Sequence, residues 1–218
     1  MADPLSIDIR HAVLIKNAEL FVITERDGSV PRGPPGFGLF YRDCCYLSGY
    51  EFSLNGTHPL LLMSAWDEGF AADIELANTN LRSSNGKPIP THTLGVTRKH
   101  LIIGDECAFV DTITFRNFSL EEVELPFALE FAAGFESIFV LRGAPPGKRG
   151  SMHVPEWKDH HIRFSYLGAD DILRRRGILS ATNRGATDER EDDREFRHHP
   201  CAAGEQGSGC LFSCRGDS

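Results

Sequence analysis

Apolar residues along most of the chain stand at every second position, in short runs that Gly, Pro and Asn interrupt. This alternation is typical of antiparallel β-strands with one buried face, and the three- and four-residue spacing of an amphipathic helix is nearly absent. The register is clearest at five evenly spaced apolar residues: Val123, Leu125, Phe127, Leu129 and Phe131. The pattern therefore predicts an all-β fold.

Asn55-Gly56 is the strongest turn signal, and it joins two predicted strands at residues 45–54 and 58–65. Asn and Gly both tolerate the positive φ that a type I′ turn requires at its two central positions. We therefore predict a β-hairpin here, with the aromatic face of its first arm in the core. Further strands are predicted at residues 13–15, 20–24, 70–76, 93–103, 108–117, 123–131, 136–141, 161–167 and 172–179.

The strand pattern ends near residue 181. The residues beyond it contain a charge run at 188–197 and only isolated apolar residues, too few to offset the entropy of ordering the backbone. We therefore expect one domain over residues 10–181 and a disordered polar tail over 182–218. Because two successive groups of strands suit two packed sheets, the domain is expected to be an antiparallel, supersandwich-like β-sandwich.

The charge balance excludes several classes of partner. The chain has 23 Lys and Arg against 31 Asp and Glu, a formal net charge of -8, which repels phosphate backbones and anionic membrane surfaces. No run approaches the roughly 18 apolar residues of a membrane-spanning helix. Residues 1–15 also lack the basic start and apolar run of an export signal. We therefore expect a cytoplasmic protein with neither nucleic acid nor membrane as a partner.

The six cysteines show no spacing typical of a zinc site, so we expect free thiols and no metal. The alternative metal site would recruit His198, His199 and Cys201 from the polar tail. The glycine-rich residues 33–38 contain no Lys and lead into a strand, unlike a phosphate-binding loop. The sequence has no GxSxG, Walker A or HExxH motif, and we expect no cofactor.

A glycosidase would need two carboxylates, about 5 Å apart for retention or about 6.5–9.5 Å for inversion. Most of the available carboxylates fall on the polar side of a strand or in a loop, which favours a solvated face over a catalytic pair. No catalytic residue is therefore assigned. The carboxylates considered are Asp43, Asp67, Glu68, Asp73, Glu75, Asp111, Glu130 and Glu136.

The segment Phe40-Tyr41-Arg42-Asp43 combines two aromatic rings with an adjacent charge pair. Such a patch could stack on a sugar ring or dock a neighbouring domain. The alternative is an ordinary strand entry, in which Arg42 and Asp43 point to opposite faces.

Several short segments occur in order along roughly residues 12–179, and together the series resembles the N-terminal domain of glycogen-debranching or amylo-α-1,6-glucosidase-like proteins. They are Gly38-Leu39-Phe40-Tyr41-Arg42-Asp43, Tyr46-Leu47-Ser48, Tyr50-Glu51, Leu54-Asn55-Gly56, Phe115-Arg116-Asn117, Leu129-Glu130-Phe131-Ala132-Ala133, Ile138-Phe139, Val140-Leu141-Arg142-Gly143, Ser165-Tyr166 and Leu173-Arg174-Arg175. The resemblance implies a β-sandwich that normally precedes a helical (α/α) barrel, and this barrel supplies the acid and base of the glycosidase.

No barrel sequence follows within the 218 residues, and the strands expected after Leu179 are replaced by charged sequence. The chain is therefore expected to be a truncated or frameshifted copy and not a complete enzyme. Our first hypothesis is a non-catalytic accessory domain of carbohydrate metabolism that packs against a helical-barrel glycosidase domain. Phe40, Arg42 and Asp43 are the residues expected at that interdomain contact.

Two other functions stay open. The chain could be a standalone binding module for α-glucan, in which aromatic residues stack on the sugar: Tyr41, Tyr46, Trp66 or Trp157. It could also be a small glycoside hydrolase in its own right, which has the least support because no catalytic pair is evident.

Overall fold

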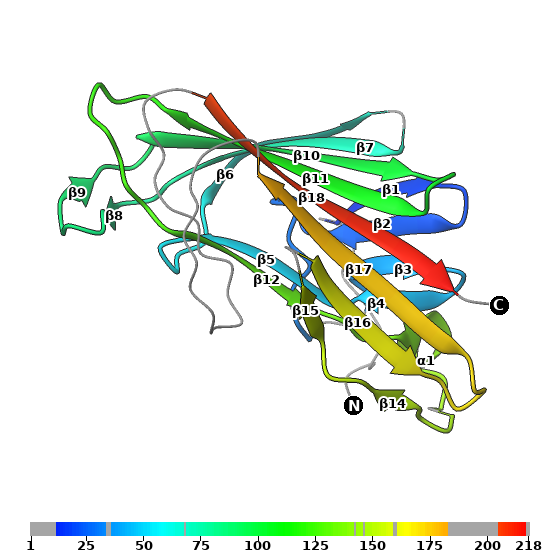
Figure 1. Cartoon of the computed structure of the whole chain (residues 1–218). Coiled ribbons are helices and arrows are strands. Elements are labelled where there is room, and N and C mark those ends of the chain that lie inside the picture. Colours follow the sequence, from blue (N-terminus) through cyan, green and yellow to red (C-terminus); the bar gives the residue numbers. More distant parts are fainter. Residues whose placement is uncertain are drawn as a thin grey trace, which may run out of the picture.

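The computed structural model describes residues 12–33, 36–67, 69–141, 143–145, 147–158, 161–182 and 205–216. Within these ranges the chain forms eighteen β-strands and one helical turn, α1 (Ile138–Leu141) (Figure 1). The strands pair antiparallel within sheets. The prediction of an all-β, antiparallel fold is confirmed.

The first layer contains a five-stranded sheet and a two-stranded ribbon. In the sheet the order is β1 (Val13–Asn17), β2 (Leu20–Thr24), β3 (Gly38–Tyr41), β4 (Cys44–Leu47) and β13 (Glu136–Ser137). The ribbon pairs β5 (Gly49–Leu54) with β12 (Phe127–Ala132). Because only Ser48 separates β4 from β5, and its amide bonds to the carbonyl of Ala132 (2.8 Å), the ribbon prolongs this layer.

The second sheet has nine strands, and its long central strands cross the whole molecule in Figure 1. Its order is β14 (Ser151–Met152), β16 (His161–Leu167), β17 (Leu173–Thr182), β18 (Glu205–Gly216), β11 (Ala108–Asn117), β10 (Leu94–Ile103), β7 (Ala71–Ala77) and β6 (Leu60–Asp67), with β15 (Glu156–Lys158) paired to β16. A small separate hairpin joins β8 (Leu81–Arg82) to β9 (Pro88–Ile89).

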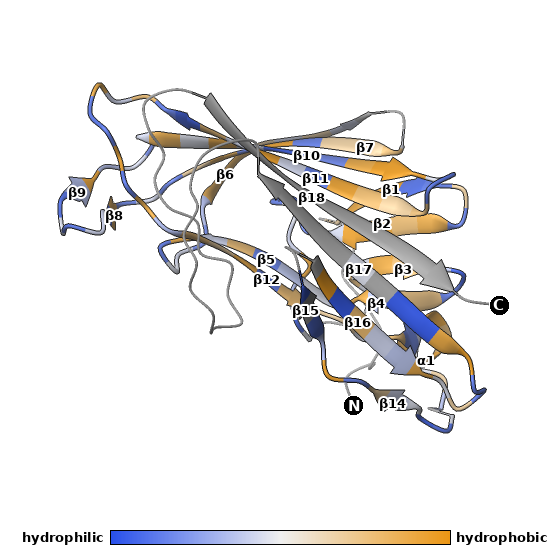
Figure 2. Cartoon of the chain, viewed as in Figure 1, coloured by the Kyte–Doolittle hydropathy of each residue, from blue (hydrophilic) through white to orange (hydrophobic). Residues whose placement is uncertain are grey.

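The core lies where the two layers face each other, and it uses alternate residues of each strand. The first layer contributes Ile15, Val22 and Leu39, and the second contributes Ile74 and Val96, all at most 1% exposed. The alternation of apolar and polar residues is visible along β10 and β11 in Figure 2. The aromatic residues of the first predicted arm are buried as expected: Tyr46, Tyr50 and Phe52.

The predicted hairpin at Asn55-Gly56 is wrong in its pairing, although its turn is correct. Asn55 (φ 48°) and Gly56 (φ 71°) have the expected positive φ, and Leu54 and Thr57 form a bridge across the turn. However, β6 pairs with β7 in the other sheet, and β5 pairs with β12. Pro59 lies just after the turn and has no amide hydrogen to extend the ladder, so the chain crosses to the second sheet there.

The strand predicted at residues 136–141 is confirmed only at its start. β13 ends at Ser137, and α1 follows. The Ser137 hydroxyl accepts a hydrogen bond from the Phe139 amide (3.3 Å), as a serine at a helix N-cap does. This local cap competes with the strand preference of the apolar residues that follow it.

The polar tail predicted over 182–218 is described only in part. Residues 183–204 and 217–218 lie outside the described residues. Within it, β18 is a strand paired with β11 on one side and β17 on the other. Pairing on both sides satisfies the backbone of a segment whose own apolar content is low.

Candidate functional site

Arg42 and Asp43 form the two-residue turn between β3 and β4, closed by the pair Tyr41 and Cys44. Both residues have positive φ, 45° and 61°, which is the backbone of a type I′ turn. The alternative of a strand entry with the two side chains on opposite faces is therefore wrong. This turn type favours Asn-Gly, and a residue with a Cβ in the left-handed region costs about 1 kcal/mol or more.

The side chains of this turn are exposed. The Arg42 Nε donates to the Glu19 carboxylate (2.8 Å), and its guanidinium lies 5.2 Å from the centre of the Tyr41 ring. The Arg42 and Glu19 side chains are 69% and 61% exposed, and Asp43 is also exposed. An ion pair this open to water contributes little to stability. Its charges therefore remain accessible to another molecule.

Phe40, the third residue expected at an interdomain contact, lies under the turn. It is 0% exposed and stacks on Phe21, with 5.0 Å between the ring centres. Its side chain therefore supports the turn from below and has no exposed surface to offer to another domain.

The helical turn α1 packs directly beside the Arg42-Asp43 turn. The Ile138 amide donates to the Asp43 carbonyl (2.8 Å), and the preceding Phe135 amide donates to the Cys45 carbonyl (2.7 Å). The ring of Phe139 on α1 is 59% exposed. We call the exposed side chains of Glu19, Arg42, Asp43 and Phe139 the turn face.

A series of aromatic rings lies behind the turn face and links the two sheets. Tyr41 is 6.4 Å from Tyr46, which meets Phe135 edge-on at 5.4 Å, and Phe135 stacks on Tyr166 of β16 at 5.5 Å. The Tyr166 hydroxyl accepts a hydrogen bond from the Gly150 amide (2.7 Å). Since aromatic pairs add stability beyond their buried area, this contact fixes one end of the sandwich.

Arg174 and Asp170 form a bidentate ion pair in the same region (3.0 and 2.8 Å). These hydrogen bonds hold the pKa of Asp170 well below its ordinary value. Burial raises the pKa of the nearby Cys44 thiol to about 11, against the lowering effect of the Arg174 charge. Cys44 is therefore protonated at neutral pH and is not a nucleophile.

Several segments that carry the family resemblance thus meet at one end of the molecule. Residues 38–43 and 46–48 come from β3 and β4, 138–141 from α1, and 165–166 and 173–175 from β16 and β17 (Figure 1). Their order along the sequence gave no indication of this convergence, because it depends on how the two sheets pack.

Sequence reasoning missed a group of buried charged residues in the centre of the sandwich. The Arg98 guanidinium donates two hydrogen bonds to one oxygen of Asp111 (3.0 and 2.6 Å), and Tyr50 donates a third (2.6 Å). His100 Nε2 lies 3.3 Å from the same oxygen, and the third Arg98 nitrogen donates to the Asp27 carbonyl (3.0 Å). We call Arg98, His100, Asp111 and Tyr50 the buried charge network.

Burial alone would raise the pKa of Asp111, but the Arg98 charge and the hydrogen bonds that Arg98 donates hold it well below its ordinary value. Burial lowers the pKa of His100 by more than Asp111 raises it. The side chains of Arg98 and Asp111 are 0% exposed, so no substrate reaches them. The expectation of a solvated face is therefore wrong for Asp111.

Strand periodicity holds the signal that could have located this network. Asp111 has the same parity as Phe109 and Ile113 on β11, and all three are buried. Arg98 likewise alternates in phase with Val96 on β10.

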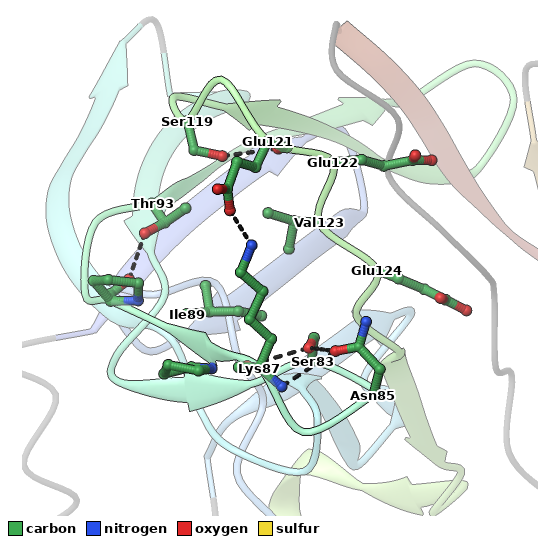
Figure 3. Close-up of a pocket in the computed structure, with 12 residues that line it drawn as sticks. Ser83, Asn85, Lys87, Ile89, Thr93, Ser119, Glu121, Glu122, Val123 and Glu124 are labelled. Carbon is green, nitrogen blue, oxygen red and sulfur yellow. Dashed lines mark hydrogen bonds and ion pairs between the residues drawn. The ribbon is translucent and has the colours of Figure 1, made fainter.

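A separate pocket of about 430 Å³ opens beside the β8–β9 hairpin (Figure 3). One wall comes from this hairpin, with Asn85 and Lys87, and the other comes from the segment that contains Glu121. Lys87 and Glu121 form an ion pair across it. The pocket is lined by hydroxyl, amide and charged groups around a small apolar floor.

The residues expected to stack on a glucan are scattered. Tyr46 is buried in the aromatic series, and Tyr41 is half-buried beside it. Trp66 is 47% exposed on β6, at the other edge of the large sheet. Trp157 belongs to β15, and its side chain lies outside the described residues.

Within the described residues, no group of three or more His, Cys, Asp or Glu could hold a metal ion. His198, His199 and Cys201 lie outside these residues. In the part of the chain that the structure describes, no helix has the length and apolar character needed to cross a membrane.

The fold defines an antiparallel β-sandwich domain, and the turn face lies at one end of it. The chain belongs to the family described as the N-terminal domain of (some) glycogen debranching enzymes, which matches residues 15–199. This match starts in β1 and extends past the end of β17. A comparison with curated proteins finds no significant match.

Proposed function

We propose that this chain is a non-catalytic accessory domain of carbohydrate metabolism, whose turn face packs against the helical barrel of a debranching-type glycosidase. Membership of the family of N-terminal domains carries the proposal, because such a domain has a following part to contact. A cytoplasmic location is part of the same proposal.

The turn face is the best candidate for this contact because it combines residue types that anchor interfaces. The exposed Arg42 lies on the turn and the exposed Phe139 lies on α1, whose first amide bonds to the Asp43 carbonyl. Arg and aromatic residues are enriched among the residues that dominate binding energy. The strained backbone at Arg42 and Asp43 adds weight, since such strain clusters at functional sites.

The test is calorimetric titration of this chain into the separately expressed helical-barrel domain of a glycogen debranching enzyme. The variant Arg42→Ala/Asp43→Ala should bind about tenfold or more weakly, because an anchoring Arg is lost. The matched control is Lys99→Ala/Asp73→Ala, which removes another exposed ion pair (3.6 Å) from the large sheet. Equal loss in both variants, or no loss in the first, contradicts the proposal.

Activity gives the second half of the test. The purified chain should hydrolyse neither α-1,6- nor α-1,4-glucosides, because the acid and base are proposed to lie on the barrel. Turnover that persists after every exposed carboxylate pair has been mutated would indicate a contaminating enzyme. Turnover that is abolished when one such pair is mutated would contradict the non-catalytic role.

The second candidate function is a standalone glucan-binding module, and the exposed Trp66 is the observation that favours it. Glycogen should then produce a saturable change in tryptophan fluorescence that Trp66→Phe abolishes. If the wild-type chain shows no such change in fluorescence, glucan binding at Trp66 is excluded.

A further inference from the structure

Strand β6 is an edge of the large sheet. Among the strands that the structure describes, it pairs with β7 on one side and ends the order of the sheet on the other. It is eight residues long, and a free edge presents backbone N–H and C=O groups to which another strand can bind. Figure 1 shows β6 well away from α1 and the β3–β4 turn, so a partner on this edge leaves the turn face free.

The other outer strands of the two sheets are short or charged, as protected edges usually are. β13 and β14 have only two residues each, and β15 has three residues, two of them charged. β1 carries the exposed Lys16. In contrast, the run Leu60–Trp66 on β6 contains no charged residue, and Asp67 follows only at the end of the strand.

Large apolar side chains of β6 are exposed to solvent. Their exposed fractions are 44% for Leu60, 56% for Leu62, 52% for Met63 and 47% for Trp66. Large apolar residues that are exposed side by side mark an interaction surface. The register against β7 shifts between Leu61 and Met63, and such an irregularity twists an edge and limits how tightly a partner can pair with it.

Charge favours a second copy of this chain as the partner. An oppositely charged protein would gain nothing from an uncharged strand, whereas a second copy offers a run of equal length and buries no charge. In an antiparallel pair centred on Met63, Leu60 of one copy lies opposite Trp66 of the second copy, so the two uncharged runs overlap completely. The two Asp67 residues then lie at opposite ends of the pair. Such a contact has the closed twofold symmetry of most homodimers.

The size of this contact makes the dimer weak. One strand of eight residues from each copy is well below the about 20–30 residues a side of a standard stable interface. The formal net charge of -8 on each copy adds repulsion. We infer that two copies of this chain pair reversibly through β6 into one continuous sheet, with a dissociation constant of about 10–100 µM.

Sedimentation velocity of the whole chain tests this pairing. The monomer should dominate at about 1 µM and the dimer at about 300 µM. Added salt should strengthen the dimer, because it screens the repulsion between the copies. Met63→Lys should weaken it about tenfold, since two like charges then face each other at the centre of the pair. Leu14→Lys is the matched control, because Leu14 is 52% exposed on β1 and the variant adds the same charge there.

A charge swap tests the symmetry of the contact. Met63→Glu alone should also weaken the dimer about tenfold, and an equal mixture with Met63→Lys should regain most of the wild-type affinity, because opposite charges then face each other. This recovery would also show that both variants are folded.

Three results would overturn the inference: a wild-type chain that stays monomeric at about 300 µM; a loss in Leu14→Lys as large as that in Met63→Lys; or a mixture of the Met63 variants that associates no more tightly than each variant alone. Protection of β6 from hydrogen exchange only when a barrel domain is added would likewise overturn it and assign this edge to the barrel. Dimerisation of the chain alone does not depend on the turn face, so the accessory role keeps its own test.

Discussion

At Arg42 and Asp43 the backbone adopts a conformation that other residues would adopt more easily. Both φ values are positive, and neither residue is glycine or asparagine. The turn 13 residues further on shows the alternative, since Asn55-Gly56 has the same signs of φ and the preferred residues. The contrast within one chain shows that Arg42-Asp43 is not the residue pair that this backbone conformation prefers.

Arg42→Asn/Asp43→Gly should therefore raise the free energy of unfolding by about 1 kcal/mol, because it relieves the strain of the left-handed positions. Urea denaturation measures the change. Arg42→Ala/Asp43→Ala keeps a Cβ at both positions and serves as the control. The stabilised variant should also bind a barrel domain more weakly, and unchanged or lower stability would contradict the strain argument.

The buried charge network predicts a second effect at residue scale. Asp111→Asn should lower the free energy of unfolding by about 3–5 kcal/mol, because it leaves Arg98 buried beside a neutral partner. Asp73→Asn on the neighbouring β7 removes an exposed carboxylate and should change stability by less than about 0.5 kcal/mol. Similar losses in the two variants would show that the network contributes no more than a surface pair.

His100 gives this network a pH dependence. Burial lowers the pKa of folded His100 below its ordinary value of 6.5. As the pH falls below about 6.5, the unfolded chain binds a proton that the folded chain does not, so the free energy of unfolding decreases. Urea denaturation at about pH 7.5 and about pH 5.5 should show this loss, and His100→Gln should reduce it. An equal loss in wild type and variant would assign it to other groups.

At the scale of elements, sequence periodicity predicts where strands lie but not what they pair with. The positions of β2, β7, β10, β11 and β16 follow from alternation alone. The separation of β5 from β6 could not be predicted, because Pro59 and the available edge of β12 decide it in three dimensions. The sequence pattern predicts a strand at α1, because Ile138–Leu141 are all apolar. The hydrogen bond from the Phe139 amide to the Ser137 hydroxyl caps a helical turn there instead.

The loop after β2 is an element whose geometry depends on one glycine. Gly28 has φ +83°, and a Cβ there would lie 2.7 Å from His100 Cε1 and 2.8 Å from Ile74 Cδ1. This close approach places the loop against β7 and β10, where the Asp27 carbonyl reaches Arg98.

Gly28→Ala should lower the free energy of unfolding by about 2–4 kcal/mol, because it adds overpacking to backbone strain. The control is Gly56→Ala, where φ is +71° and the Cβ would meet nothing within 4 Å. It should cost only about 1 kcal/mol, measured by thermal or urea unfolding. If both variants lose the same free energy of unfolding, the loop accommodates the added methyl group without strain.

At the scale of the whole molecule, the sequence predicted an all-β domain and its family, and it located two of the four side chains of the turn face. Arg42 and Asp43 stood out as a charge pair beside aromatic residues. Glu19 and Phe139 could not be assigned, because they join the turn only through the packing of β2 and α1. The pocket at the β8–β9 hairpin could not be predicted, since its second wall lies far along the chain.

Hydrogen–deuterium exchange of the chain, free and in complex with the helical-barrel domain of a glycogen debranching enzyme, tests the central claim most directly. The account predicts slower exchange on complex formation at the β3–β4 turn and α1, where backbone groups of the turn face become covered. Exchange in β6, at the far edge of the large sheet, should be unchanged. Protection confined to β6, or the absence of a complex, would contradict the assignment of the turn face as the interdomain contact.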